Sequence, residues 1–202
     1  MHELLDYRRQ VNELYRSIRH SDDPLTAWQH FCETRDTLFQ THVQSPLDTE
    51  AKAVFSCLPY YDYDPNYRVM AHIETNVAAF ELEYDLGEDG HFRCSRFGEV
   101  YFTLPSGSAS LSVFWIKGYG GGLFLPFADS TNRTTTYGGG RYLYDTIKGA
   151  DLGSFNDELI LDFNFAYNPS CAYSPRWTCP LAPQENRLAI PVLAGEQILR
   201  TA

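Results

Sequence analysis

Residues 67–74 read YRVMAHIE, and this stretch decides the class of fold. Its apolar side chains alternate with polar ones, a pattern typical of a β-strand with one buried face. Similar short runs, separated by turn-forming residues, predict further strands at 80–85, 99–104, 109–117, 123–128, 142–147, 158–165 and 188–193. Many short strands joined by glycine-rich turns indicate an antiparallel barrel or sandwich. The chain is therefore expected to be mainly β.

The first 45 residues follow a helical period instead. Apolar side chains recur at steps of three and four, which predicts an amphipathic helix carrying Leu4, Tyr7, Val11, Leu14 and Ile18. Residues 21–24, SDDP, end this helix and begin a second, with Asp as the cap and Pro in the first turn. One stripe of the second helix holds Leu25, Trp28, Phe31, Cys32, Arg35, Leu38, Phe39 and His42. We expect a helical arm over 1–45 and an antiparallel β domain over 46–202, forming one compact domain.

Composition limits the partners. The formal net charge is −10 at pH 7, and no run of Lys or Arg occurs. Nucleic acid and anionic membranes require a clustered positive field, so neither is an expected partner. No segment approaches the ~20 apolar residues that cross a bilayer, and no apolar leader follows Met1. Five scattered cysteines, an odd number, favour free thiols, so the expected location is the cytoplasm.

Two long motifs stand in the second half of the chain. They are FADSTNRTTTYGGGRYLY at 127–144 and LDFNFAYNPSCAYSPRWTCPLAPQENRLAIPVLAGE at 161–196, preceded by HVQSPL at 42–47 and YDYDPNYRV at 61–69. Together they resemble an uncharacterised family called domain of unknown function 1684, over roughly residues 35–196. The resemblance implies no reaction, cofactor or catalytic residue, because the family has none assigned.

Asp162 and Asn164 lie at the end of the strand expected over 158–165, on the face opposite Leu161 and Phe163. If that face points into a barrel, a carboxylate and an amide meet at its mouth, where small molecules often bind. Alternatively, the face meets solvent, or Asp162 accepts backbone N–H bonds and fixes the next loop.

The segment 166–187, here called the strap, is too polar for a core strand and carries Tyr167, Asn168, Tyr173 and several prolines. Proline fixes φ and removes a donor, so the strap is expected to run as turns and extended pieces. A loop of this length is either a binding loop or a structural strap across the barrel. Its two cysteines, 171 and 179, are structural thiols, a disulfide, or metal ligands together with a histidine such as His42.

Further polar candidates flank these segments. Glu185, Asn186 and Arg187 end the strap, and Arg187 is a candidate partner of Asp162 or of a ligand carboxylate. Asp129, Tyr137 and Arg141 border the glycines 138–140, which lack the Lys and the following helix of a phosphate loop. These glycines more simply allow a bulge or a close crossing of another segment.

Two functions remain open from the sequence. The first is a small-molecule-binding β domain, either a binding protein or an enzyme, whose ligand is held by the polar candidates above. The second is a structural or interaction module in which the same residues clamp the fold and the helical arm packs on the barrel or on a second copy. No metal site, no cofactor and no reaction type is identified by any motif.

Overall fold

The alternating stretch 67–74 forms strand β1 (Arg68–Glu74), which lies between β8 (Glu158–Asp162) and β3 (His91–Leu104) in a single sheet. These strands belong to a computed structural model that describes residues 1–199. The remaining strands are β2 (Glu81–Asp85), β4 (Gly107–Ile116), β5 (Gly122–Phe127), β6 (Arg141–Asp145) and β7 (Ser154–Phe155).

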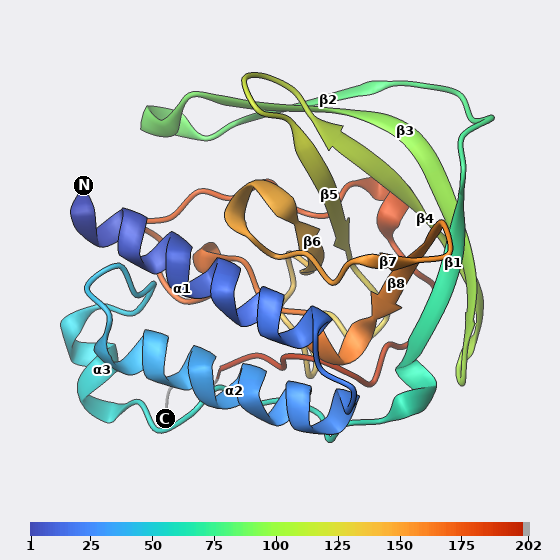
Figure 1. The fold of residues 1–202 in the computed structure, drawn as a ribbon. Helices are drawn as coiled ribbons and strands as arrows, with labels where there is room; N and C mark the ends of the chain where they lie inside the picture. Colours follow the sequence, from blue (N-terminus) through green and yellow to red (C-terminus); the bar gives the residue numbers. More distant parts are fainter. Residues whose placement is uncertain (200–202) are drawn as a thin grey trace.

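All strand pairs are antiparallel, and the order is β6-β5-β4-β3-β1-β8-β7, with β2 added beside β3. The sheet curls into a half-barrel that is open on one side (Figure 1). The prediction of a mainly β, antiparallel fold with an N-terminal helical arm is thereby confirmed. Of the two forms expected, this one is closer to a barrel than to a sandwich.

The helical arm contains α1 (His2–Arg19) and α2 (Pro24–Thr41). Asp23 caps α2 by accepting hydrogen bonds from the backbone N–H groups of Leu25 and Thr26. A third, short helix that the sequence pattern did not indicate, α3 (Thr49–Val54), follows. No helix within residues 1–199 combines the length and apolar character that a bilayer crossing requires.

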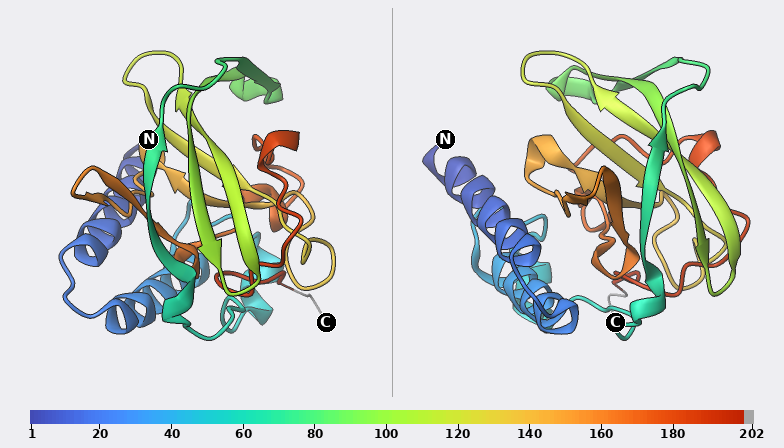
Figure 2. Two further views of the ribbon diagram at one scale, coloured as in Figure 1. Left: turned by 90° about the vertical axis from the view of Figure 1, so that its right-hand side faces the viewer. Right: turned by 45° about the vertical axis from the view of Figure 1, so that its right-hand side comes forward.

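The arm lies across the open side of the half-barrel and shares its core (Figure 2). Leu14 of α1 and Phe31 of α2 are buried in the same cluster as Phe127 and Phe165. The ring centroids of Phe31 and Phe165 are 5.2 Å apart in an edge-on arrangement. The middle of each apolar stripe is therefore used against the chain's own sheet, whereas Leu4 and Leu25 are 45 % and 43 % exposed.

The start of the strap lies between the arm and the sheet, whereas its end packs on β4 and β5 (Figures 1 and 2). At its start, Tyr167 exchanges two backbone hydrogen bonds with Tyr142 of β6. Near its end, the Asn186 carbonyl accepts from the backbone N–H of Ala128, just beyond β5. The strap therefore runs along this edge of the half-barrel without becoming a strand.

The C-terminal end of the chain differs from one prediction. Residues 188–193 were expected to form a strand, but they make bends and irregular chain. Pro191 has no N–H to donate to a ladder, and the carbonyl groups of Val192 and, just beyond, Ala194 accept hydrogen bonds from Arg141. The strand expected over 158–165 likewise stops at Asp162 and continues as a 3-10 turn, Phe163–Phe165.

Candidate functional site

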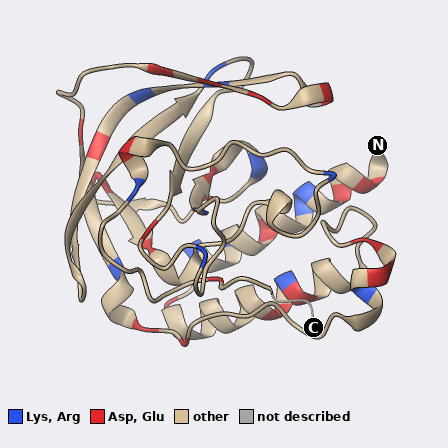
Figure 3. Cartoon of the chain, turned by 180° about the vertical axis from the view of Figure 1, so that it is seen from behind, with Lys and Arg blue, Asp and Glu red and all other residues tan. Residues whose placement is uncertain are grey.

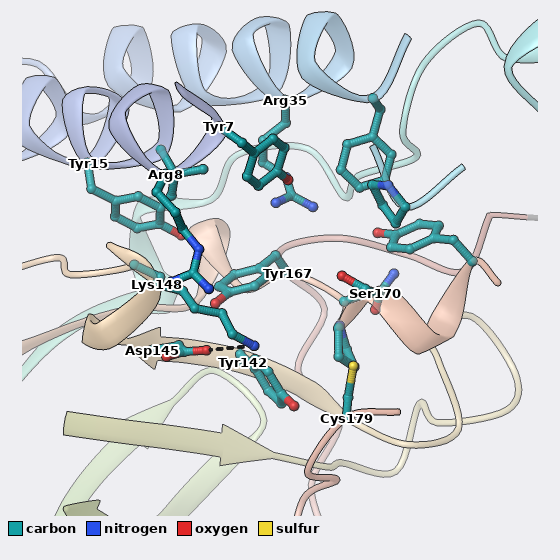
Figure 4. A pocket seen from close by; sticks show the side chains of 17 residues that line it. Tyr7, Arg8, Tyr15, Arg35, Tyr142, Asp145, Lys148, Tyr167, Ser170 and Cys179 are labelled. Atoms are coloured by element: carbon teal, nitrogen blue, oxygen red, sulfur yellow. Dashed lines mark ion pairs between the residues drawn. The ribbon is translucent and has the colours of Figure 1, made fainter. Parts of the chain in front are cut away.

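A cleft opens where the helical arm faces β6 and the strap, and we call it the arm–strap cleft (Figure 4). It contains about 650 Å³ of space free of atoms, counted together with its open mouth. Side chains from α1, α2, β6 and the strap line it. Those with a polar atom are Tyr7, Arg8, Tyr15, Arg35, Tyr142, Asp145, Lys148, Tyr167, Asn168, Ser170, Tyr173 and Cys179.

A buried ion pair lies beside this cleft. Arg35 Nη2 is 2.7 Å from Glu196 Oε2, and the Glu196 side chain has no exposed surface. Tyr173 donates its hydroxyl to the other carboxylate oxygen, and the backbone N–H of Asn168 donates to Oε2 at 3.0 Å. Burial raises the pKa of the Glu196 carboxyl, and the charge of Arg35 opposes that shift. Because both oxygens are bonded, the pair is a satisfied internal network.

Arg35 is also enclosed by rings. Its guanidinium carbon lies 5.2–5.3 Å from the ring centroids of Phe31, Phe39 and Tyr167. Its Nε donates to the Tyr60 hydroxyl at 2.8 Å. Planar guanidinium groups stack well on aromatic faces, so Arg35 fixes the position of the Tyr167 ring in the cleft wall.

Two further cations point into the same space in Figure 4, Arg8 from α1 and Lys148 from the turn after β6. Arg8 donates to the Ile147 carbonyl at 3.2 Å, and Lys148 lies 3.5 Å from Asp145. Elsewhere, basic and acidic residues are interspersed along the chain, as Figure 3 shows from behind. For a protein with a net charge of −10, a cleft lined by three cations and one carboxylate is a local reversal of charge.

Two buried polar atoms of the cleft lining have no hydrogen-bond partner in the structure, the Tyr15 hydroxyl oxygen and Asn168 Oδ1. Both residues are only 3 % exposed. Asn168 uses its amide nitrogen on the Gln197 carbonyl at 2.9 Å, which leaves the oxygen as a free acceptor. An unmade buried hydrogen bond costs about 1–3 kcal/mol, so these two atoms are unused hydrogen-bonding capacity beside the cleft.

Of the sequence candidates, Tyr167, Asn168 and Tyr173 line the arm–strap cleft. The others lie elsewhere. The expectation that acid, amide and guanidinium groups of the motifs would meet at one barrel mouth is not what the structure shows. The interior there is filled by apolar side chains such as Phe127, Phe163 and Leu161.

Arg141 and Asp129 form a buried pair of their own. Arg141 has no exposed surface, and its Nη2 lies 2.8 Å from Asp129 Oδ2 and 3.0 Å from the Val192 carbonyl. The Ala194 carbonyl accepts from Nη1, and Phe127 stacks on the guanidinium. Arg141 therefore joins β6 to the C-terminal segment, as a clamp would.

Asp162 and Asn164 do not line the arm–strap cleft and lie at the other end of the helical arm. Asp162 is opposite Arg68 in the β1–β8 register, with 3.5 Å between Arg68 Nε and Asp162 Oδ2, so Arg68 occupies the place considered for Arg187. Asp162 Oδ1 accepts from the Asn164 backbone at 3.1 Å, as the structural alternative required. Asn164 in turn bonds the backbone of Asp64. Burial raises the pKa of Asp162 to about 6.

The residues at the end of the strap differ in how far they are buried. Asn186 is fully buried and bonds the backbone of Ser112 and Pro126, whereas Glu185 and Arg187 are exposed. Gly140 has φ +91°, and a Cβ there would lie 2.5 Å from the Phe127 carbonyl. The expectation that the glycines permit a close crossing is therefore confirmed.

The two strap cysteines contact each other and Tyr137, whose hydroxyl is 3.5 Å from the Cys171 sulfur. All five cysteines are free. His42 lies 3.4 Å from Asp6 and packs edge-on against Tyr7, away from the cysteines. Within residues 1–199, no three His, Cys, Asp or Glu side chains are grouped so as to hold a metal ion.

Sequence reasoning missed the adjacent Glu196 and part of the cleft lining, namely Tyr7, Arg8, Tyr15, Arg35 and Lys148. One signal was present: Arg35 is a charged residue within the apolar stripe of the second helix, and a buried arginine needs a partner. The others carry no such mark. Their role depends on the packing of the arm against the sheet.

The fold and the cleft together define a mainly β half-barrel protein closed by a helical arm. A family model described as "Protein of unknown function (DUF1684)" matches residues 53–197, so the chain belongs to this family and the resemblance of its motifs is confirmed. A similar solved structure is the solution NMR structure of an uncharacterised protein of Haloarcula marismortui. It is 34 % identical with a TM-score of 0.59, and the match covers 85 % of this chain and 92 % of that one. No curated protein matches this chain.

Proposed function

We propose that this protein binds a small organic anion in the arm–strap cleft. The observation that carries the proposal is the pair of unpartnered buried atoms, the Tyr15 hydroxyl and Asn168 Oδ1, in a cleft lined by cations. Most other buried polar side chains are satisfied within the fold, so the open hydrogen-bonding capacity here supports a ligand.

The lining defines the class of ligand. Arg35 is paired with Glu196, so Arg8 and Lys148 are the cleft cations that we propose meet an anionic group such as a carboxylate or phosphate. Asn168 Oδ1 can only accept, so the ligand supplies a hydroxyl or amine donor there. Rings of Tyr7, Tyr142 and Tyr167 flank this space and suit a flat or apolar body.

The test measures binding by the full chain. A panel of small carboxylates and phosphates, each paired with a neutral amide or alcohol analogue, is screened by thermal shift and followed by calorimetry. Anionic members are expected to raise the melting temperature and their neutral analogues are not. Arg8→Gln removes one charge-assisted hydrogen bond and is expected to weaken binding about tenfold.

Arg9→Gln is the matched control. Arg9 follows Arg8 on the same helix but has a side chain 65 % exposed and pairs with Asp6 outside the cleft. This variant changes the net charge equally and is expected to bind as the wild type does. Equal weakening of binding in both variants would show that net charge, and not the cleft, governs the affinity. Either this result or the absence of binding by every anion would overturn the proposal.

A structural or interaction module is the second candidate. It is supported by the Arg141–Asp129 pair and by Asn186, whose polar groups are used inside the fold. In this case the C-terminal motif is a clamp and the arm is the working part, including as the contact between two copies. The two candidates use different residues, so variants of the clamp and of the cleft separate them.

The proposed location is the cytoplasm, which the five free cysteines support. Neither nucleic acid nor an anionic membrane is proposed as a partner, because the net charge of −10 opposes both. No reaction or cofactor is part of the proposal.

A further inference from the structure

Two cysteines of the strap differ from the other three in their surroundings. Cys171 lies in the 3-10 turn Ser170–Ala172, and its side chain interacts with that of Cys179. Both thiols are partly exposed. By contrast, burial raises the pKa of Cys94 to about 12. Burial is also the main cause of the raised pKa of Cys32. The chain therefore holds one pair of accessible, adjacent thiols.

Two polar side chains meet the Cys171 sulfur. The Tyr137 hydroxyl oxygen lies 3.5 Å from it, and the Cys179 thiol interacts with it. Lys148 adds a favourable charge. Led by the contact with Cys179, these groups lower the pKa of Cys171 to about 6 against the effect of burial. The same contact raises the pKa of Cys179, which keeps its proton. The contact therefore favours the thiolate form of Cys171 over that of Cys179.

Both thiols are partly exposed, and Cys179 can also be reached from the arm–strap cleft. Cys179 forms part of the cleft wall opposite Lys148, as Figure 4 shows. The strap around it runs as turns and irregular chain between prolines 175 and 180 and is not held in a ladder of strand hydrogen bonds. Because no such ladder holds this part of the strap, it can move to bring the two sulfurs to the ~2.05 Å of a disulfide.

We propose that Cys171 and Cys179 form an oxidisable dithiol site whose substrate is a hydroperoxide. The Cys171 thiolate attacks the terminal oxygen of ROOH. A sulfur–oxygen bond forms, the O–O bond breaks, and the leaving alkoxide takes a proton to become ROH. The sulfur of Cys179 then attacks the Cys171 sulfenic acid. A disulfide forms, the sulfur–oxygen bond breaks, and the departing hydroxyl leaves as water with the Cys179 proton.

In total, two thiols are oxidised by two electrons while one ROOH is reduced to ROH and water. A thiol of low molecular mass, by two exchange steps, returns the disulfide to the dithiol. This inference does not require that the cleft bind an anion, so it stands or falls separately from the proposed function.

The experiment uses the reduced full chain, freed of reductant and mixed with one equivalent of hydrogen peroxide or cumene hydroperoxide at pH 7. Free thiols are counted and the intact mass and peptides are measured. Two thiols are expected to disappear, the mass to fall by two hydrogen atoms, and peptides holding Cys171 and Cys179 to be joined. Cys171→Ser should slow the reaction roughly tenfold or more, since it removes the activated thiolate.

Two further variants distinguish the roles. Cys179→Ser leaves the attacking sulfur without its partner, so a sulfenic acid that dimedone traps at Cys171 is expected. Tyr137→Phe keeps both sulfurs but removes the hydroxyl group, so the pH of half-maximal alkylation by iodoacetamide should rise. Cys57→Ser, at an exposed thiol outside the pair, is the control and should react as the wild type does.

The proposal is overturned if peroxide leaves all thiols intact, if the joined peptides involve other cysteines, or if Cys171→Ser reacts at the wild-type rate. Should Cys171→Ser fail to fold, as judged by circular dichroism, Tyr137→Phe decides. An unchanged alkylation profile and an unchanged rate with peroxide in that variant would also overturn it.

Discussion

Arg35 of α2 and Glu196 near the end of the chain form an ion pair with 2.7 Å between Nη2 and Oε2, although 161 residues separate them in sequence. Glu196 is fully buried and also bonds Tyr173 and the backbone of Asn168. The pair thus joins the helical arm, the strap and the C-terminal segment at one point beside the cleft.

Removing Glu196 should therefore destabilise the whole fold. Glu196→Ala leaves the guanidinium of Arg35 without its counter-charge, and a loss of about 3–5 kcal/mol in the free energy of unfolding is expected in urea titrations. The double variant Arg35→Met with Glu196→Leu should lose less, because no charge stays buried. Arg19→Ala, which breaks a partly exposed pair with Asp151, is the control and should lose no more than about 1 kcal/mol from that pair. A Glu196→Ala protein as stable as the wild type would contradict the network.

The loss of stability on replacing an arginine of the C-terminal motifs should depend on how far that arginine is buried. Arg141→Ala leaves Asp129 buried and unpaired and is expected to cost about 3–5 kcal/mol. Arg187→Ala changes an exposed side chain and is expected to stay within about 0.5 kcal/mol of the wild type. Thermal melts of both variants beside the wild type are the measurement. A large loss in Arg187→Ala would show that the end of the strap is held by Arg187 after all.

Asp162 should make stability depend on pH. Burial raises its pKa to about 6 in the folded chain, above the ordinary value of 3.8, so between these values the folded state binds more protons than the unfolded state. Stability therefore falls as the pH rises from about 4 to 6, by roughly 3 kcal/mol at 1.36 kcal/mol per pKa unit. Asp162→Asn keeps the acceptor oxygen and should remove this slope. Urea titrations between pH 4 and 7 measure it.

Asp22→Asn, at an exposed carboxylate between the two helices, is the control for that experiment and should keep the wild-type slope. If the slope survives in Asp162→Asn, another buried acid must cause it. Glu196, whose pKa is also raised by burial, is then the next residue to vary.

Gly140 should tolerate no side chain. Its φ of +91° is unfavourable for other residues, and a Cβ would lie 2.5 Å from the Phe127 carbonyl and 2.9 Å from Ala182. Gly120 has a similar φ of +99° with nothing within 4 Å, so Gly120→Ala isolates the backbone strain, about 1–2 kcal/mol. Gly140→Ala should cost a further ~1–3 kcal/mol from crowding. Equal losses of stability in the two variants would mean that β5 and the strap do not approach Gly140 so closely.

The sequence predicted structure correctly where interactions between neighbouring residues decide it. The period of 67–74 predicted β1, Asp23 with Pro24 predicted the start of α2, and the prolines of the strap predicted that it would not join the sheet. It failed over 188–193, where a strand-like pattern was overruled. The Val192 carbonyl there, and that of Ala194 just beyond, accept from the buried Arg141 instead of from a neighbouring strand.

The candidate site shows the same division. Tyr167, Asn168 and Tyr173 were chosen from the strap and do line the cleft, whereas Arg187 was considered as the partner of Asp162 and is not. Register decides this: Asp162 is opposite Arg68 when β1 pairs with β8, and no local pattern specifies which strands pair. Whether the predicted residues bind a ligand stays a prediction.

By itself, the sequence determined the class of fold, the family and the irregular course of the strap, because side-chain period, turn residues and long motifs are properties of neighbouring residues. Only the tertiary structure decided which charges are paired and where a cleft remains. Arg35 and Glu196, or Cys171 and Tyr137, meet because the arm and the strap pack on one half-barrel. Such contacts depend on the register and curl of the whole sheet, which no single segment encodes.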